Sequence, residues 1–172
     1  MTLKRCFPPV VDEHTRVLIL GSLPGDASLK HSQYYAHPQN RFWRLMGDLL
    51  EIDLVSMAYG TRLDTLLAHR IGLWDVVAEA RREGSLDSRI RHHAGNDLAG
   101  LVTSLPDLAA IAFNGGTAAR LGMKALAPHD ARHTMLTLPS SSPAHTLAYA
   151  EKLAAWQAML PWLDVSIQNK EP

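Results

Sequence analysis

The ten residues RVLILGSLPG, at positions 16–25, join a short apolar run to a loop rich in glycine and proline. The run is continuously apolar from Val17 to Leu20 and stops at Gly21. An uninterrupted apolar run of this length is typical of a strand that is buried on both faces. Such strands occur in parallel sheets covered by helices, so the stretch predicts an α/β fold with a strand over 16–20.

Strand and helix patterns alternate along the rest of the chain. The predicted elements are, in order, helices over 41–50 and 59–70, a strand over 71–77, a helix over 96–105, a strand over 108–113, a short helix ending near 121, a strand over 133–138, and a long final helix starting near Pro143. This alternation predicts parallel β–α–β connections and a sheet covered by helices.

Length and composition limit the class of protein. A chain of 172 residues is expected to form one domain over 1–172. Its 17 basic and 17 acidic residues give zero net charge, so composition alone indicates neither a nucleic-acid nor a membrane partner. The single cysteine, Cys6, excludes an intramolecular disulfide and a four-cysteine iron–sulfur or zinc site. No signal peptide or membrane span is evident, which predicts a location in the bacterial cytosol or nucleoid.

Three polar loops follow predicted strands, at 21–40, 114–117 and 139–145. They are the stretches after strands that are richest in Gly, Pro, Ser and Asn. Ligands of open α/β sheets bind outside the carboxyl ends of the strands. We therefore expect these loops to build a binding site together.

Common catalytic motifs are absent from these loops. The segment GSLPG has neither the glycine spacing of a dinucleotide-binding loop nor the Gly-Lys-Ser/Thr of a P-loop. In GDASL an alanine separates Asp26 from Ser28, unlike the GDSL esterase motif, and no G-x-S-x-G elbow occurs. The nine histidines include no H-E-x-x-H, so we expect neither a catalytic metal nor another cofactor.

The segments GSLPG (21–25), YYAHPQNRFW (34–43), FNG (113–115) and LPSSSP (138–143) resemble motifs of the uracil-DNA glycosylase superfamily. The most similar branch is that of the hypoxanthine-DNA (deoxyinosine) glycosylases, and the resemblance covers nearly the whole chain. It implies a three-layer α/β fold with a mostly parallel four-stranded sheet flanked by helices. It also implies base excision repair, in which hypoxanthine is removed from DNA to leave an abasic site, with uracil and xanthine as further candidate bases. DNA with deaminated bases would be the partner, without a membrane, a metal or an obligate protein partner.

The resemblance assigns base contacts to five residues. An enzyme that acts on a base in a duplex flips the nucleotide into a pocket, which needs a flat surface for stacking. Tyr35 matches the stacking aromatic, although Tyr34 or Tyr35 could equally pack in the core. Asn114 offers a donor and an acceptor for the base edge, but Asn is also common in turns. The remaining candidates are Ser22, Leu23 and His37, the last of which is alternatively a buried structural histidine.

Asn40 is the candidate catalytic residue. Better-known relatives position the attacking water with an Asp or Asn at the place that Leu23 occupies here. An amide oxygen can orient water but cannot take its proton at neutral pH, so the mechanism would depend on departure of the base. Asn40 also precedes a predicted helix and is a good N-cap, so both roles stay open. Asp26 is the substitute general base if Asn40 is not catalytic.

Several residues are candidates for contacts with the DNA backbone. The resemblance and the helix predicted after Pro143 suggest a phosphate site, because helix N-termini bind phosphate. Its residues are Gly25, Ser140, Ser141, Ser142 and His145, although Ser142 is alternatively only an N-cap and His145 only a solvent-facing residue. The most basic stretch contains Arg81, Arg82, Arg89, Arg91, His92 and His93, which form either a phosphate-contacting or a solvated face.

Three other functions remain open at the level of the sequence. The chain could be a weakly catalytic or non-catalytic protein that binds damaged DNA, because Leu23 and Leu138 occupy positions that are catalytic in relatives. A small-molecule hydrolase would need Ser-His-acid motifs that are absent. A lyase would need an amine nucleophile, for which Lys30 is the lysine near the first motif.

Overall fold

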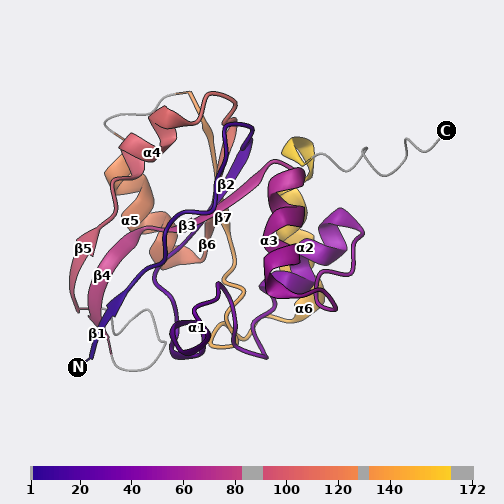
Figure 1. Ribbon diagram of the computed structural model, residues 1–172, viewed down its shortest axis with the longest axis horizontal. Helices are drawn as coiled ribbons and strands as arrows, with labels where there is room; N and C mark the ends of the chain where they lie inside the picture. The colour runs from indigo at the N-terminus through magenta and orange to yellow at the C-terminus, as the bar shows by residue number, and fades with distance from the viewer. Residues whose placement is uncertain (1, 83–90, 128–131, 164–172) are drawn as a thin grey trace.

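A parallel four-stranded sheet forms the centre of the protein in a computed structural model, which describes residues 2–82, 91–127 and 132–163 (Figure 1). The strand order is β3 (Ile71–Asp75), β2 (Val17–Gly21), β6 (Ala110–Asn114) and β7 (Thr134–Leu138), and all three pairings are parallel. This arrangement confirms the predicted α/β class and the four-stranded sheet.

Helices cover both faces of this sheet, and β2 shows why. All five residues of β2 are buried, as its continuous apolar run predicts. Val17 and Ile19 share a core with α2 (Phe42–Leu50), α3 (Tyr59–Ala68) and α6 (Tyr149–Trp156). Leu18 and Leu20 point to the other face and share a core with α4 (Leu98–Ser104) and α5 (Gly116–Leu126). Figure 1 shows these two groups of helices on opposite sides of the sheet.

A second, antiparallel sheet corrects the prediction of one strand over 71–77. Its order is β1 (Thr2–Arg5), β4 (Val77–Arg82) and β5 (Arg91–Gly95). The apolar run belongs to two strands, β3 and β4, separated by Val76. Val76 and Val77 donate backbone hydrogen bonds to the carbonyls of Gly21 and Ser22 at 2.8 and 3.0 Å, and the chain then leaves the parallel sheet. Periodicity within the run cannot indicate such a change of partner, because Val76 and Val77 continue its apolar pattern although only Val77 lies in β4.

Three helices differ from their predicted bounds. A short helix, α1 (Asp26–His31), lies inside the segment expected to be a loop. The helix α5 extends to Leu126 rather than ending near Leu121. The final helix starts at Tyr149 and not near Pro143, because Ala148 has an extended backbone, and a 3-10 helix (Gln157–Trp162) follows it.

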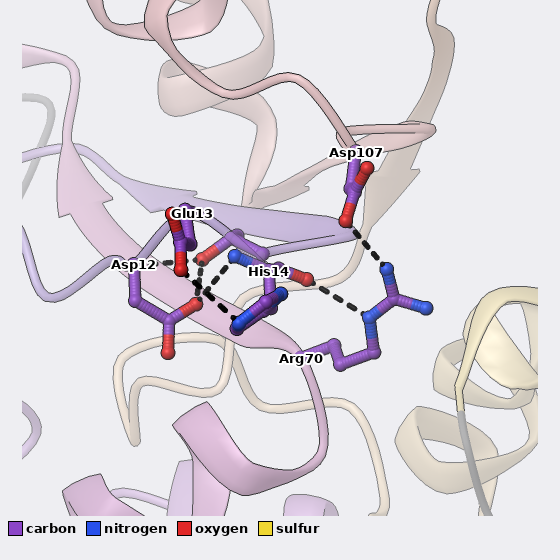
Figure 2. Close-up of polar contacts among 6 residues, drawn as sticks. Asp12, Glu13, His14, Arg70 and Asp107 are labelled. Atoms are coloured by element: carbon purple, nitrogen blue, oxygen red, sulfur yellow. Dashed lines mark hydrogen bonds and ion pairs between the residues drawn. The ribbon is translucent and has the colours of Figure 1, made fainter.

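A polar cluster joins the segments that precede β2, β3 and β6 (Figure 2). The Arg70 side chain donates to the carbonyl of His14 at 2.9 Å and to Oδ2 of Asp107 at 3.0 Å. The backbone N–H of His14 donates to Oδ1 of Asp12 at 2.9 Å. These contacts lie at the edge where the parallel strands begin, so a site at their carboxyl ends lies at the opposite edge. No helix in the described ranges is long and apolar enough to span a membrane.

Candidate active site

A cavity of about 430 Å³ opens at the carboxyl ends of the parallel strands. It is lined by residues of the three loops expected to meet there, at 21–40, 114–117 and 140–145. The residues predicted for water positioning, base contacts and the phosphate site are all among them: Ser22, Leu23, Gly25, Tyr35, His37, Asn40, Asn114, Ser140, Ser141, Ser142 and His145. The strand register explains the convergence, because Gly21 pairs with Asp75 and Asn114 pairs with Leu138 at the same edge.

The adjacent tyrosines of the second motif have different roles. Tyr34 is 4% exposed and donates its hydroxyl to the carbonyl of Pro8 at 3.0 Å. Burial, together with the negative charge of Asp75, raises the pKa of Tyr34, which keeps this phenol protonated. Tyr35 stacks on Phe42 with ring centroids 4.0 Å apart and planes 22° apart. Tyr35 also has a φ of 56°, which is uncommon for a residue other than glycine and holds the ring against the cavity.

Asn40 lies between this aromatic stack and the cavity. Its Oδ1 accepts a hydrogen bond from the backbone N–H of Phe42, the first residue of α2, at 2.9 Å. The N-cap of α2 is Arg41, so the prediction of Asn40 as the N-cap is wrong by one residue, although its side chain still pairs with the start of the helix. An amide oxygen has two lone pairs, so one remains for a water molecule, and the Nδ2 group remains as a donor.

The amide of Asn114 is clamped to the loop after β7. Its Nδ2 donates to Oγ of Ser141 at 2.9 Å, and its Oδ1 accepts from the backbone N–H of Ser141 at 2.9 Å. Both residues are buried. Gly115 follows with a φ of 101°, and a Cβ at this position would lie 3.2 Å from Cβ of Ser140. One hydrogen of Nδ2 and one lone pair of Oδ1 remain available for a ligand.

The helix α6 holds the loop of residues 139–142, here called the serine loop, by hydrogen bonds to its carbonyl groups. Trp156 donates its indole N–H to the carbonyl of Pro139 at 2.8 Å, and Lys152 donates to the carbonyl of Ser142 at 3.1 Å. The N–H of Ser142 donates to Oγ of Ser140 at 3.1 Å. The predicted helix N-terminus at Pro143 is therefore wrong, since a hydrogen-bonded loop occupies this place.

Two cations lie close to the serine loop. Lys152 is 3% exposed, and burial together with the positive charge of Arg41 lowers its pKa. Arg41 is exposed and donates its backbone N–H to the carbonyl of Ser141 at 3.0 Å. Within the described ranges neither side chain forms an ion pair with a carboxylate. Two cations held together without a carboxylate favour an anionic ligand.

Two predictions about the first loops need correction. His37 is exposed and its Nδ1 accepts from the N–H of Gln39 at 3.1 Å, so it is not a buried structural histidine. Asp26 does not line the cavity and pairs instead with the buried Lys4, which removes it as the substitute general base. The physical reason is that α1 turns this carboxylate toward β1. Lys30 does not line the cavity either.

Asp75 is the cavity residue that the sequence reasoning missed. It is the last residue of β3, is 4% exposed and lines the cavity. The available signal was a carboxylate inside an apolar run, because Asp is rarely buried without a specific reason. A Cβ on Gly21 would lie 2.7 Å from Oδ1 of Asp75 and 3.0 Å from the hydroxyl of Tyr35, so a glycine is needed between them.

The remaining predictions concern the basic stretch and metals. Arg81 and Arg82 fall on β4, and Arg91, His92 and His93 fall on β5. Arg89 lies outside the described residues. In the part of the chain that the structure describes, no three His, Cys, Asp or Glu side chains are grouped as ligands for a metal ion.

Comparisons with known proteins identify the family of this chain. The model of the uracil DNA glycosylase superfamily matches residues 8–165. A protein named hypoxanthine DNA glycosylase from Methanosarcina acetivorans is 43% identical over 157 residues, which cover 91% of this chain and 98% of that protein. A protein of the same name from Methanosarcina barkeri is 48% identical over 112 residues, which cover 65% of this chain and 71% of that protein.

A solved structure has the same fold. It is a solution NMR structure of a Methanosarcina acetivorans protein provisionally described as a uracil DNA glycosylase. The TM-score is 0.80 at 42% identity, with 92% of this chain and 97% of that chain covered. By sequence, by fold and by the loops that meet at its cavity, the chain belongs to the uracil DNA glycosylase superfamily, in the branch of these two hypoxanthine DNA glycosylases.

Proposed function

We propose that this protein is a monofunctional DNA glycosylase of base excision repair. It hydrolyses the N-glycosidic bond of deoxyinosine flipped out of DNA and leaves an abasic site. The observation that carries the proposal is the cavity in which a stacked aromatic ring, Tyr35, adjoins the amide of Asn40. The relatives named hypoxanthine DNA glycosylase support hypoxanthine as the base that is removed.

Stacking holds the flipped base in the proposed complex. One face of the Tyr35 ring is covered by Phe42, which is fully buried, so the other face is left for a base. Base–aromatic stacking contributes about 1–3 kcal/mol. The positive φ of Tyr35 keeps the ring in place before the DNA arrives, which lowers the ordering cost of binding.

Asn40 orients the attacking water in the proposed reaction. The hydrogen bond from the N–H of Phe42 fixes its side chain, and its second lone pair accepts from water near C1′ of the sugar. An amide does not take the proton, so the bond to the base breaks ahead of attack and the sugar acquires oxocarbenium character. The base leaves with its electron pair, and water supplies the hydroxyl at C1′ and a proton. Asn114 holds Ser141 in the wall and offers its remaining N–H to the base edge.

The proposed DNA contacts surround the mouth of the cavity. Gly25, the serines 140–142 and the exposed His145 supply N–H and hydroxyl groups on one side. Arg41 and Lys152 supply positive charge beside them. A lyase step would need an amine in the cavity, and none of the residues that line it is a lysine.

Single-turnover cleavage of labelled oligonucleotides tests this function. Each substrate carries one deoxyinosine, deoxyuridine or deoxyxanthosine, and alkali after the reaction breaks the strand at abasic sites. We expect alkali-dependent cleavage at deoxyinosine and no cleavage before alkali. Cleavage without alkali would show a lyase, and cleavage only at deoxyuridine would move the preference to uracil. Tight binding without any cleavage would indicate a non-catalytic protein that binds damaged DNA.

A further inference from the structure

We infer that Asp75 selects the base by accepting a hydrogen bond from its lactam N–H, which is N1–H in hypoxanthine. This inference rests on the proposed glycosylase function. It names the residue that distinguishes hypoxanthine from adenine, the base that yields hypoxanthine on deamination. It begins from the observation that Asp75 is the one acidic residue among those that line the cavity in the described ranges.

The fold holds Asp75 at the floor of the cavity. It ends β3 and pairs in register with Gly21 of the neighbouring strand β2, and both residues are buried. Asn96 donates its amide N–H to the backbone carbonyl of Asp75 at 2.7 Å, which fixes the chain at this point. The Cβ position of Gly21 lies close to both Oδ1 of Asp75 and the hydroxyl of Tyr35. The carboxylate therefore adjoins the hydroxyl end of the ring on which the base stacks.

Depth decides which edge of the base meets Asp75. His37 and the segment 143–145 are exposed and mark the mouth of the cavity, whereas Asp75 is 4% exposed. The sugar of a flipped nucleotide remains joined to the DNA backbone outside, so the base enters first. The floor then meets the edge furthest from the sugar. In a purine joined through N9 this is the six-membered ring with N1 and the group on C6.

Hydrogen-bond chemistry then gives the selectivity. An ionised carboxylate only accepts hydrogen bonds. Hypoxanthine presents N1–H at this edge, whereas adenine presents a bare N1 lone pair that the carboxylate repels. Sites that pair a buried polar group with a substrate N–H reject analogues that lack it, because the group is left unsatisfied. Uracil also has a lactam N–H, so Asp75 selects a class of bases that includes both products of deamination. Guanine has N1–H too, and this contact does not exclude it.

The same depth argues against Asp75 as the general base. The attacking water must lie at C1′, toward the mouth, while Asp75 lies at the floor. A carboxylate beside a departing base also gives no stabilisation to the negative charge that develops there. Its effect should therefore appear in the half-saturating enzyme concentration more than in the maximal rate constant.

Paired substrates test the inference. Single-turnover rates are measured over a range of enzyme concentrations for deoxyinosine and for N1-methyldeoxyinosine, which lacks the N–H. The wild-type protein should prefer deoxyinosine by about tenfold to a hundredfold, as expected for a hydrogen bond to a charged group. In Asp75→Ala this preference should fall to within about threefold, mainly through the half-saturating concentration. Asp26→Asn is the matched control, because that carboxylate does not line the cavity, and it should keep the wild-type preference.

A second variant keeps the shape of the side chain. Asp75→Asn retains an acceptor for N1–H and gains a donor for N1 of adenine, so free adenine should bind it more tightly than it binds the wild type. Thermal-shift titrations with hypoxanthine, 1-methylhypoxanthine and adenine measure this without turnover, and the melting curves report folding of each variant. Hypoxanthine should stabilise the wild type more than the other two bases.

Two results would overturn this inference without contradicting the proposed glycosylase function. One is wild-type protein that cleaves or binds the methylated and unmethylated bases equally. The other is an unchanged preference in Asp75→Ala together with an equal loss of rate on both substrates, which would indicate a general base or a structural role. Failure of the proposed function is distinct, because it would be the absence of deoxyinosine cleavage by the wild type, whatever base the cavity prefers in the thermal-shift titrations.

Discussion

Oδ1 of Asn40 accepts a hydrogen bond from the backbone N–H of Phe42 at 2.9 Å, so the candidate catalytic amide is bonded to the first residue of α2. Phe42 in turn supports the ring of Tyr35. The start of one helix therefore fixes both the group proposed to orient water and the surface proposed to stack the base. Variants that separate this structural bond from catalysis follow from the arrangement.

Asn40→Ala should lower both stability and excision, whereas Asn40→Ser should lower excision alone. Loss of the hydrogen bond to the N–H of Phe42 costs about 1 kcal/mol of unfolding free energy, and a serine hydroxyl can accept the same bond two residues on. A serine hydroxyl does not reach as far as the amide, so misplacement of the water should slow excision by on the order of a hundredfold in both variants. Urea denaturation and single-turnover cleavage of deoxyinosine measure the two effects. Full activity of Asn40→Ser would mean that Asn40 serves only to hold the start of α2.

Replacement of Tyr35 should weaken binding through the lost ring. Tyr35→Ala removes the stacking surface, which contributes about 1–3 kcal/mol, so the affinity for an uncleaved deoxyinosine analogue should fall about tenfold to a hundredfold. Tyr35→Phe keeps the ring and its contact with Phe42, so it should stay within a few fold of the wild type. Fluorescence anisotropy with labelled DNA gives both values. Equal losses in the two variants would assign the effect to the hydroxyl instead.

Gly21→Ala should damage the cavity without unfolding the protein. The new Cβ would lie 2.7 Å from Oδ1 of Asp75 and 3.0 Å from the hydroxyl of Tyr35, so both groups must shift. Overpacking of this kind costs about 1–3 kcal/mol. Gly60→Ala is the matched control, since nothing lies within 4 Å of its Cβ position, and in a helix it should be neutral or stabilising by up to about 1 kcal/mol. Melting temperatures and deoxyinosine cleavage compare the pair, and normal cleavage by Gly21→Ala would contradict the proposed cavity.

Arg41→Ala should reduce the salt dependence of DNA binding. If Arg41 neutralises one phosphate, the slope of log K against log salt concentration should become shallower by about 1. The loss of affinity should be similar for DNA with and without deoxyinosine, because phosphate contacts carry no base information. Arg16→Ala, at the edge where the strands begin, is the control and should leave the slope unchanged. An unchanged slope for Arg41→Ala would place the DNA elsewhere.

Lys152→Met should change how stability depends on pH. Burial and the charge of Arg41 lower the pKa of Lys152 in the folded state. Between that lowered pKa and the unfolded value of about 10.4, the unfolded chain binds more protons, so the wild type gains stability as pH rises. The methionine variant lacks this gain. The melting temperature of the wild type should therefore rise relative to that of Lys152→Met as pH increases from about 7 to about 10. Parallel curves for the two proteins would show that the charge of Lys152 has no cost in the fold.

Local patterns predicted the framework well for a physical reason. A strand buried on both faces needs a continuous apolar run, and helices on a sheet need an apolar stripe, so β2, α2 and α3 are visible in the sequence. The run over 71–77 predicts one strand because Val76 and Val77 continue the apolar pattern of β3. Only hydrogen bonding with Gly21 and Ser22 shows where the chain leaves the first sheet for the second.

The α/β class, the polar loops after the strands and the motifs that place the chain in its superfamily can all be predicted from the sequence, because they depend on residues near one another in the chain. The partners of each side chain depend on the folded structure. The fold turned Asp26 toward Lys4, clamped Asn114 to Ser141 and brought Asp75 to the cavity floor. Such contacts join residues far apart in the sequence, and they follow from strand order and register, which no local pattern encodes.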